Sequence, residues 1–170
     1  MATDPETDGR PRPQRPFPRV LFGLAAVALA ARLLGPSIED RVSWVAPAAA
    51  DTTARASGRP LLYNFTAEWC GPCKRLEHDL FADARHAQWL GTRFVPVRVL
   101  DREREEGRNS AEVEALKTRF DVDAFPTLIV VGADGTVLAR QEGYGGTARE
   151  LVRTLGKAAD KAAAARSQKR

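Results

Sequence analysis

Residues 61–73 read LLYNFTAEWCGPC, a short run of β-prone residues that leads directly into two cysteines. Cys70 and Cys73 are the only cysteines of the 170-residue chain and are three positions apart. The run predicts a strand, and Pro72 suits the first turn of a helix, where its missing N–H would have no partner. At such a helix start, free N–H groups and a partial positive charge favour a Cys70 thiolate, with Cys73 one turn later on the same face. The stretch therefore predicts a redox pair that cycles between dithiol and disulfide.

The cysteine count limits the other uses of the pair. Two cysteines cannot form a disulfide scaffold or a four-cysteine zinc site. A bond between them closes so small a loop that it restricts the unfolded chain little, so its purpose is chemical rather than structural. A C-x-x-C pair can also bind copper(I) or share a zinc ion, with His78 or His86 as a further ligand. We favour an exposed helix position for His78, and we expect no metal and no other cofactor.

The residues around this stretch predict alternating helices and strands. Leu76, Leu80 and Phe81 recur at helical spacing, which extends the helix after the cysteines to about residue 81. The other predicted elements are a helix at 46–57, a helix from an Asp83 N-cap through Leu90, a strand at 93–100, a helix capped by Asn109 that contains Val113, Leu116 and Phe120, strands at 127–131 and 136–140 joined by an Asp-Gly turn, and a last helix capped by Thr147. This order is typical of an α/β fold with a mixed central sheet and helices on both faces.

The net charge of +4 is unevenly distributed. Residues 59–156 contain 14 basic and 15 acidic side chains, whereas residues 157–170 contain five basic and one acidic. The near-neutral balance of the folded part argues against a nucleic-acid partner. The charge-dense stretch 101–108, DREREEGR, is predicted as a solvated connection, with a partner-docking surface as the alternative.

Residues 20–31, VLFGLAAVALAA, form an apolar run that follows four arginines. The run has the length of a signal-peptide core and is shorter than the roughly 20 residues of a standard membrane span. We predict a signal anchor, with a cleaved signal peptide as the first alternative and a buried helix of a cytosolic protein as the second. With the arginines on the cytoplasmic side of a bacterial-type cell membrane, the rest of the chain would lie on the extracytoplasmic, periplasmic side.

These patterns divide the chain into five parts. Residues 1–19 hold five of the eleven prolines and are predicted to be a disordered tail. A hydrophobic segment at residues 20–35 and a linker at 36–40 follow. We expect the α/β domain at residues 41–158 and a basic tail at 159–170.

The WCGPC motif is followed about fifty positions later by Phe125-Pro126-Thr127. Together with the order of elements, these residues resemble the thioredoxin superfamily over about residues 41–156. In detail, GRPLLYNFTAEWCGPCKRLEHDLFAD is similar to the membrane-linked branch typified by the C-terminal domain of the transmembrane thiol-disulfide interchange reductases. In that branch an Ala-rich helix and a Gly-Lys/Arg-Pro precede the strand, so the resemblance implies that Trp44 belongs to the domain.

The resemblance implies a role for each matching residue. Cys70 is the nucleophile that attacks a substrate disulfide, and Cys73 is the resolving cysteine that releases the product. Pro126 matches the cis-proline that faces the cysteines, where the backbone binds an extended substrate strand. The remaining matches support the site: Trp69 shields the nucleophile, Gly71 and Pro72 separate the cysteines, Phe125 and Thr127 bind substrate beside Pro126, and Gly143 leaves room for a partner.

One position departs from the family pattern. Thioredoxins usually carry a buried aspartate on the strand before the motif, which exchanges a proton with the resolving cysteine, but this chain has Asn64 there. An amide cannot act as that base. We hypothesise that Glu68, or water, assists the deprotonation of Cys73, with an ordinary exposed charge as the alternative role of Glu68.

The sequence thus predicts an extracytoplasmic thiol-disulfide oxidoreductase. Its Gly-Pro dipeptide is that of thioredoxin, whose potential of about −270 mV contrasts with about −120 mV for strong oxidants, so we expect a reductase. The expected partners are oxidised client proteins, a membrane protein that donates electrons, and the membrane itself through the N-terminal segment. A non-catalytic binding or chaperone module and an oxidase or isomerase of disulfides are the alternatives.

Overall fold

The computed structural model describes residues 40–168 of the chain. The predicted proline-rich tail, the hydrophobic segment at residues 20–35 and nearly all of the linker lie outside these residues and stay predictions. No helix in the described part of the chain is both long enough and apolar enough to cross a membrane.

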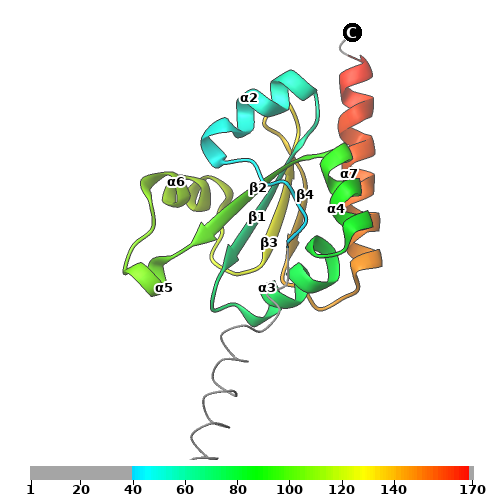
Figure 1. Cartoon of the computed structure of the whole chain (residues 1–170). Coiled ribbons are helices and arrows are strands. Elements are labelled where there is room, and N and C mark those ends of the chain that lie inside the picture. Colours follow the sequence, from blue (N-terminus) through cyan, green and yellow to red (C-terminus); the bar gives the residue numbers. More distant parts are fainter. Residues whose placement is uncertain (1–39, 169–170) are drawn as a thin grey trace, which may run out of the picture. The chain divides into compact units, whose positions relative to one another are not determined.

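A four-stranded sheet forms the centre of the described residues (Figure 1). Its strands are β1 (Leu61–Ala67), β2 (Val95–Asp101), β3 (Thr127–Val131) and β4 (Val137–Glu142), in the spatial order β2-β1-β3-β4. β1 is parallel to β2 and antiparallel to β3, and β3 is antiparallel to β4. The predicted α/β fold with a mixed sheet is confirmed.

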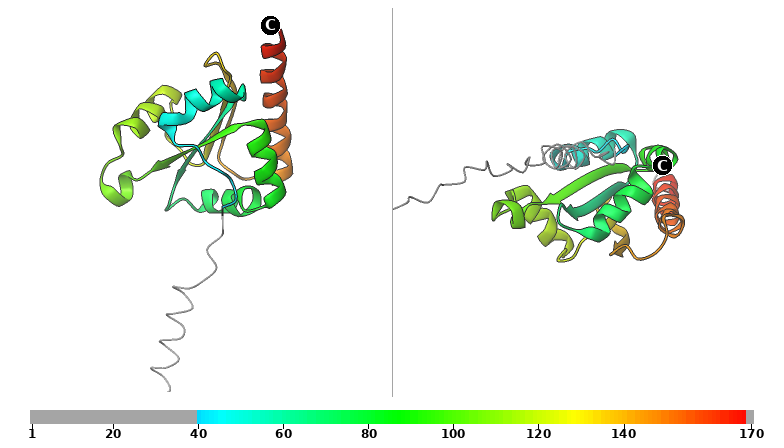
Figure 2. Two further views of the ribbon diagram at one scale, coloured as in Figure 1. Left: turned by 45° about the horizontal axis from the view of Figure 1, so that its top comes forward. Right: turned by 60° about the horizontal axis from the view of Figure 1, so that its bottom comes forward.

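Helices cover both faces of this sheet, as Figures 1 and 2 show. All seven residues of β1 are buried, and because successive strand residues point to opposite faces, they feed two cores. Leu62 belongs to the core under α3, η1, α4 and α7, whereas Tyr63 and Phe65 belong to the core under α2 and α6. The bounds of these helices are α2 Pro47–Ser57, α3 Gly71–Leu76, η1 Glu77–Phe81, α4 Ala84–Arg93, α6 Ala111–Phe120 and α7 Ala148–Gln168.

The helix after the cysteines extends to Phe81, as its apolar spacing predicts, but its last part, η1, is a π-helix. The sequence pattern did not indicate this wider turn. The next helix begins as predicted, because the Asp83 carboxylate accepts hydrogen bonds from the backbone N–H groups of Arg85 and His86 at 3.0 and 2.9 Å. It ends at Arg93, three residues later than predicted.

Trp44 packs inside the domain, as the family resemblance implies. Its ring meets the Phe81 ring edge-on at 5.0 Å between centroids. The indole N–H donates to the Asp40 carboxylate at 2.7 Å. The residues just before α2 are therefore part of the folded unit.

Two details of the charge-dense stretch differ from the prediction. Residues 101–108 are not only a connection, since they contain a one-turn helix, α5 (Glu103–Glu106). The following helix is capped by Ser110, whose hydroxyl accepts from the Val113 N–H at 3.3 Å, and not by Asn109. Asn109 is unavailable as a cap because its side-chain oxygen accepts from the Arg102 N–H at 2.6 Å, while its amide donates to the Asp101 carboxylate at 2.7 Å.

The last helix, α7, begins with a capping box, as the sequence predicts. The Thr147 hydroxyl accepts from the Glu150 N–H at 3.3 Å, and the Glu150 carboxylate accepts from the Thr147 N–H at 3.1 Å. The helix continues without a break to Gln168, so the expected start of a basic tail at residue 159 falls inside it. Ala159 is buried, and the Arg166 guanidinium donates to the Gly58 carbonyl, which ties this helix end to the end of α2.

Candidate redox site

The two cysteines lie where β1 gives way to α3, and they form a disulfide. Cys70 is the N-cap of α3, with extended backbone, and its Sγ accepts from the Cys73 N–H at 3.2 Å. Cys73 lies in the first turn, so the two Cα atoms are 5.2 Å apart. A sulfur held against the free N–H groups of a helix start is favoured as a thiolate once the disulfide opens. Gly71 and Pro72 occupy the first helical positions, as predicted.

Both cysteines are buried, at 3% and 2% exposure, in a small cluster with Ala67. Phe125 packs against this cluster from the loop before β3. The bond between Phe125 and Pro126 is cis, as the resemblance implies. The chain thus brings together the WCGPC motif and the Phe125-Pro126 segment, which are about fifty positions apart in the sequence.

The residues around Pro126 are held by backbone hydrogen bonds. The Gly143 N–H donates to the Pro126 carbonyl at 2.8 Å, and Gly143 has a φ of 68°, a conformation that glycine adopts without a steric penalty. Thr127 is buried, and its hydroxyl donates to the Ala124 carbonyl at 2.8 Å. Gly143 and Thr127 therefore lie beside the cis-proline, where the sequence places them.

Trp69 forms an exposed rim next to the buried cysteines. Its side chain is 48% exposed, which is unusual for so large an apolar group. The ring meets Phe125 edge-on at 6.0 Å between centroids, and the Arg104 guanidinium lies 5.3 Å from the Trp69 ring centroid. Arg104 belongs to α5, so the charge-dense stretch contributes directly to the rim of the site. The sequence did not identify Arg104, because nothing in its spacing connects it to Trp69.

The acids near the cysteines differ from the usual thioredoxin arrangement. Glu68 is half exposed and forms an ion pair with Arg102 at 3.6 Å. Glu77, which sequence reasoning missed, donates its backbone N–H to the Cys73 carbonyl, and its more buried carboxylate pairs with Arg98 at 3.9 Å. Both carboxylates are therefore engaged by arginines.

Asn64 occupies the position of the missing aspartate and is 1% exposed. It lies in register between Arg98 on β2 and Leu128 on β3. Within residues 40–168, its side-chain oxygen has no hydrogen-bond partner. The buried polar group before the motif is thus an uncharged amide with an open acceptor.

A second buried polar network lies at the end of β2. The Asp101 carboxylate, in a residue 4% exposed, accepts from Lys117 Nζ at 2.5 Å, from the Asn109 amide at 2.7 Å and from the Glu103 N–H at 3.2 Å. Burial raises the pKa of Asp101, but the hydrogen bonds from Lys117 and Asn109 outweigh it and leave the pKa below its usual value. Burial likewise lowers the pKa of Lys117, and the bond to Asp101 reverses this and raises it. Sequence reasoning missed this network because it does not show which acid of DREREEGR is buried.

The metal alternatives gain no geometric support in the part of the chain that the structure describes. His78 lies beside Asp79, with Nδ1 and Oδ1 2.9 Å apart, and His86 lies 3.4 Å from the Asp83 carboxylate. Among residues 40–168, the close group of potential metal ligands consists of Asp101, Glu103 and Glu114, and contains neither cysteine. Lys117 Nζ contacts all three of its carboxylates, so an ammonium already occupies the position of a cation.

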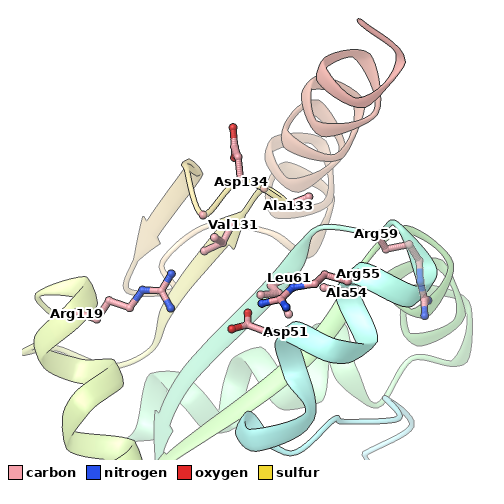
Figure 3. Close-up of a pocket in the computed structure, with 11 residues that line it drawn as sticks. Asp51, Ala54, Arg55, Arg59, Leu61, Arg119, Val131, Ala133 and Asp134 are labelled. Carbon is pink, nitrogen blue, oxygen red and sulfur yellow. The ribbon is translucent and has the colours of Figure 1, made fainter. Parts of the chain in front are cut away.

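A cavity of about 230 Å³ lies at the other end of the sheet, beside the first residue of β1 (Figure 3). Asp51 and Arg55 reach it from α2 and Arg119 from α6, and the turn between β3 and β4 closes it. Its charges are mixed, and neither cysteine lines it. The disulfide instead follows the C-terminal end of β1, next to Trp69.

Known proteins with similar sequences are disulfide-exchange proteins. The chain is 34% identical over 83 residues to a thiol:disulfide interchange protein DsbD of Salmonella paratyphi A, which covers 48% of this chain and 13% of that protein. It is 29% identical over 140 residues to the DsbD of Yersinia enterocolitica, covering 73% and 23%, and 35% identical over 80 residues to a rice protein disulfide isomerase-like 5-3, covering 47% and 16%. The chain therefore spans less than a quarter of the length of these relatives.

Solved structures with the same fold include a thioredoxin and a domain of a DsbD protein. A Thermus thermophilus thioredoxin superposes with a TM-score of 0.61 at 23% identity, over 74% of this chain and 92% of that one. The oxidised DsbD C-terminal domain of Neisseria meningitidis superposes with a TM-score of 0.54 at 22% identity, over 65% and 90%. At these identities the likeness establishes the fold alone.

A family model described as a thioredoxin-like domain matches residues 47–159, a stretch that contains both cysteines and the cis-proline. The match, the mixed sheet and the disulfide at the start of α3 agree with one another. The chain belongs to the thioredoxin-like domain family, as a thiol-disulfide oxidoreductase with the Cys70–Cys73 pair, and resembles the C-terminal domain of DsbD.

Proposed function

We propose that this protein is an extracytoplasmic reductase of protein disulfides, anchored by its N-terminal segment. The observation that carries the redox part is the position of Cys70: an N-cap sulfur that accepts the Cys73 N–H, beside a cis-proline. The Gly-Pro pair between the cysteines, which is that of low-potential thioredoxins, supports reduction rather than oxidation.

The reduced protein would transfer two electrons to its client. The Cys70 thiolate attacks one sulfur of a client disulfide, forms a mixed disulfide and releases the other client sulfur as a thiolate. The Cys73 thiolate then attacks the Cys70 sulfur, which breaks the mixed disulfide and releases the second client thiolate. The protein ends with the Cys70–Cys73 disulfide, and the two protons lost by the cysteines end on the client thiols.

Each cycle leaves the protein oxidised, so a dithiol donor must reduce it again. We propose a membrane protein as this donor and oxidised proteins of the same compartment as clients. The name that the bacterial relatives share, thiol:disulfide interchange protein, is consistent with such a chain of exchanges. The arginines followed by the apolar residues 20–31 support a location outside the cytoplasm.

The proton of Cys73 needs an acceptor other than Asn64, and we propose Glu68 or water. Glu68 follows β1 directly, and its carboxylate is half exposed. The test is the pH dependence of the reduction rate in Glu68→Gln, with Glu77→Gln as the matched change of the other nearby carboxylate. A profile shifted only in Glu68→Gln supports this role, and an unchanged profile removes Glu68 from the mechanism.

Reduction of insulin disulfides tests the enzyme assignment. The full-length chain should catalyse it with dithiothreitol as donor, and Cys70→Ser should abolish the catalysis. Equal activity in both would leave the non-catalytic binding module as the better interpretation. The equilibrium potential against glutathione tests the direction: a value near about −270 mV supports a reductase, and one near about −120 mV supports an oxidase.

A further inference from the structure

The rim above the disulfide is flanked by three cations, and two of them are already neutralised. Arg102 pairs with Glu68 at 3.6 Å and with Glu106 at 3.1 Å. Lys117, whose Nζ lies 5.9 Å from the Phe125 ring centroid, is surrounded by three carboxylates. The third cation, Arg104, forms no ion pair with any acid of residues 40–168.

Arg104 is instead held by an aromatic ring. Its guanidinium lies 5.3 Å from the centroid of Trp69, the residue that immediately precedes Cys70. Contact with a ring face satisfies the guanidinium electrostatically but uses none of its five N–H donors. These donors stay available to a planar acceptor such as a carboxylate.

The position of the Trp69 ring determines which part of a client lies near Arg104. Cys70 is 3% exposed, and the residue just before it, Trp69, is 48% exposed and contacts Phe125, so a client disulfide that reaches the Cys70 sulfur passes close to the Trp69 ring. The residues that flank the client cysteine then lie near this ring. A client with an acidic flanking residue would place its carboxylate beside the unpaired guanidinium.

We propose that Arg104 is a specificity-determining residue that favours client disulfides flanked by aspartate or glutamate. The inference rests on the proposed reductase function and adds the chemical class of its clients. The charge-dense stretch at residues 101–108 is then a client-docking surface as well as a connection. Because the Arg104 guanidinium is exposed, its effect on the reduction rate should be that of an exposed ion pair. Such an effect is modest in size and is weakened by salt.

Three synthetic peptides test this proposal. Each contains one disulfide between two cysteines, and both cysteines are flanked by glutamate in the first, glutamine in the second and lysine in the third. The reduced full-length chain is mixed with each peptide under single-turnover conditions, and the reduced peptide is measured by acid quenching and chromatography. The variants are Arg104→Ala, Arg104→Glu and, as a matched control, Arg108→Ala. Arg108 is an exposed arginine of the same stretch.

We expect the wild-type rate constant to be about threefold to fivefold higher for the glutamate peptide than for the lysine peptide. The ratio should fall to about one in Arg104→Ala, invert in Arg104→Glu, persist in Arg108→Ala, and decline as NaCl rises from about 0.02 M to about 0.5 M. Circular dichroism checks that each variant is folded, and Arg104→Gln replaces any variant that is not.

The outcomes separate this inference from the proposed function. Equal rates for all three peptides in the wild type would overturn the role of Arg104 and leave the oxidoreductase intact, as would a ratio that Arg104→Ala does not change. If the wild type reduces no peptide and no insulin, the proposed function itself fails, and the inference fails with it.

Discussion

Asn64 and Asp101 are both buried polar residues of the central sheet, yet their surroundings are opposite. The Asp101 carboxylate accepts three hydrogen bonds from α5, α6 and the loop between them. The Asn64 side-chain oxygen accepts none within the described residues. One site is a saturated charge network, and the other is a neutral group with an open acceptor beneath the redox helix.

A buried charge is stabilised by its partners at Asp101, whereas the buried group at Asn64 is uncharged. Lys117 binds Asp101 to α6 and Asn109 binds it to the loop before α6, while Arg104 of α5 contacts the Trp69 ring and Lys117 lies 5.9 Å from the Phe125 ring centroid. At Asn64, by contrast, the partner in register on β2 is Arg98, whose guanidinium already pairs with Asp40 and Glu77 and whose buried Nε has no hydrogen-bond partner among residues 40–168. We therefore expect Asp101 to be a requirement for stability and position 64 to tolerate uncharged residues.

The largest expected effect is that of Asp101→Asn. The amide keeps the shape of the carboxylate but leaves the largely buried Lys117 ammonium without its closest counter-charge. We expect the free energy of unfolding to fall by about 2 to 4 kcal/mol, measured by urea denaturation at pH 7. Glu103→Gln is the matched control, because Glu103 contacts the same ammonium from an exposed position and should cost less than about 1 kcal/mol. Equal losses in the two variants would contradict the assignment of Asp101 as the centre of the network.

The reverse exchange, Asn64→Asp, should cost about 2 kcal/mol at pH 7. Burial would raise the pKa of the new carboxyl, because its charged form loses hydration without gaining a free counter-charge. A raised pKa in the folded state makes the penalty largest above that pKa, and the gap to the wild type should close as pH falls toward about 4. Urea denaturation between pH 4 and pH 8 measures this, and a gap that widens on acidification would show that Arg98 accepts the new charge as a partner.

A smaller effect is the acid dependence of the wild type. The pKa of Asp101 is lowered on folding, so its charged form contributes stability above the ordinary value of 3.8, and this contribution is lost as pH falls through the folded pKa. Asp101→Asn should therefore show a shallower decline of stability below about pH 4 than the wild type. Parallel curves for the two proteins would mean that other carboxylates account for the acid limb.

Asn64 and Asp101 also differ in how much of their surroundings can be predicted from the sequence. The Asp83 cap, the Thr147 capping box and the placement of Cys70 at the start of a helix are predictable, because each depends on residues within a few positions of one another. The mixed sheet with helices on both faces follows from the order of these elements and the family resemblance. Asn64 was recognisable for the same reason, since the resemblance identifies the position that an aspartate usually occupies.

The long-range polar contacts were not predictable. Lys117 and Asp101 are 16 residues apart, and Arg166 and Gly58 are 108 apart, so no local pattern connects them. The wrong N-cap has a similar cause. Asn109 is a good capping residue, but its side-chain oxygen accepts from the Arg102 N–H and its amide donates to the buried Asp101, so Ser110 caps instead. In each case a tertiary partner overrides a local preference.

The smallest expected effect, and the sharpest test of the contrast, is Asn64→Leu. Removing a buried acceptor that has no hydrogen-bond partner among residues 40–168 removes a desolvation cost, while leucine, of similar size, fills the same place beside Leu128 in the register of β1 and β3. Neither change is expected to be destabilising, so the free energy of unfolding should change by less than about 1 kcal/mol, whereas the same substitution at Asp101 should cost several times more. Urea denaturation of both leucine variants measures the difference. A loss at position 64 as large as that at position 101 would mean that the Asn64 amide holds a hydrogen bond, through water, that stabilises the strand beneath the cysteines, and the distinction between a saturated and an open polar site would no longer hold.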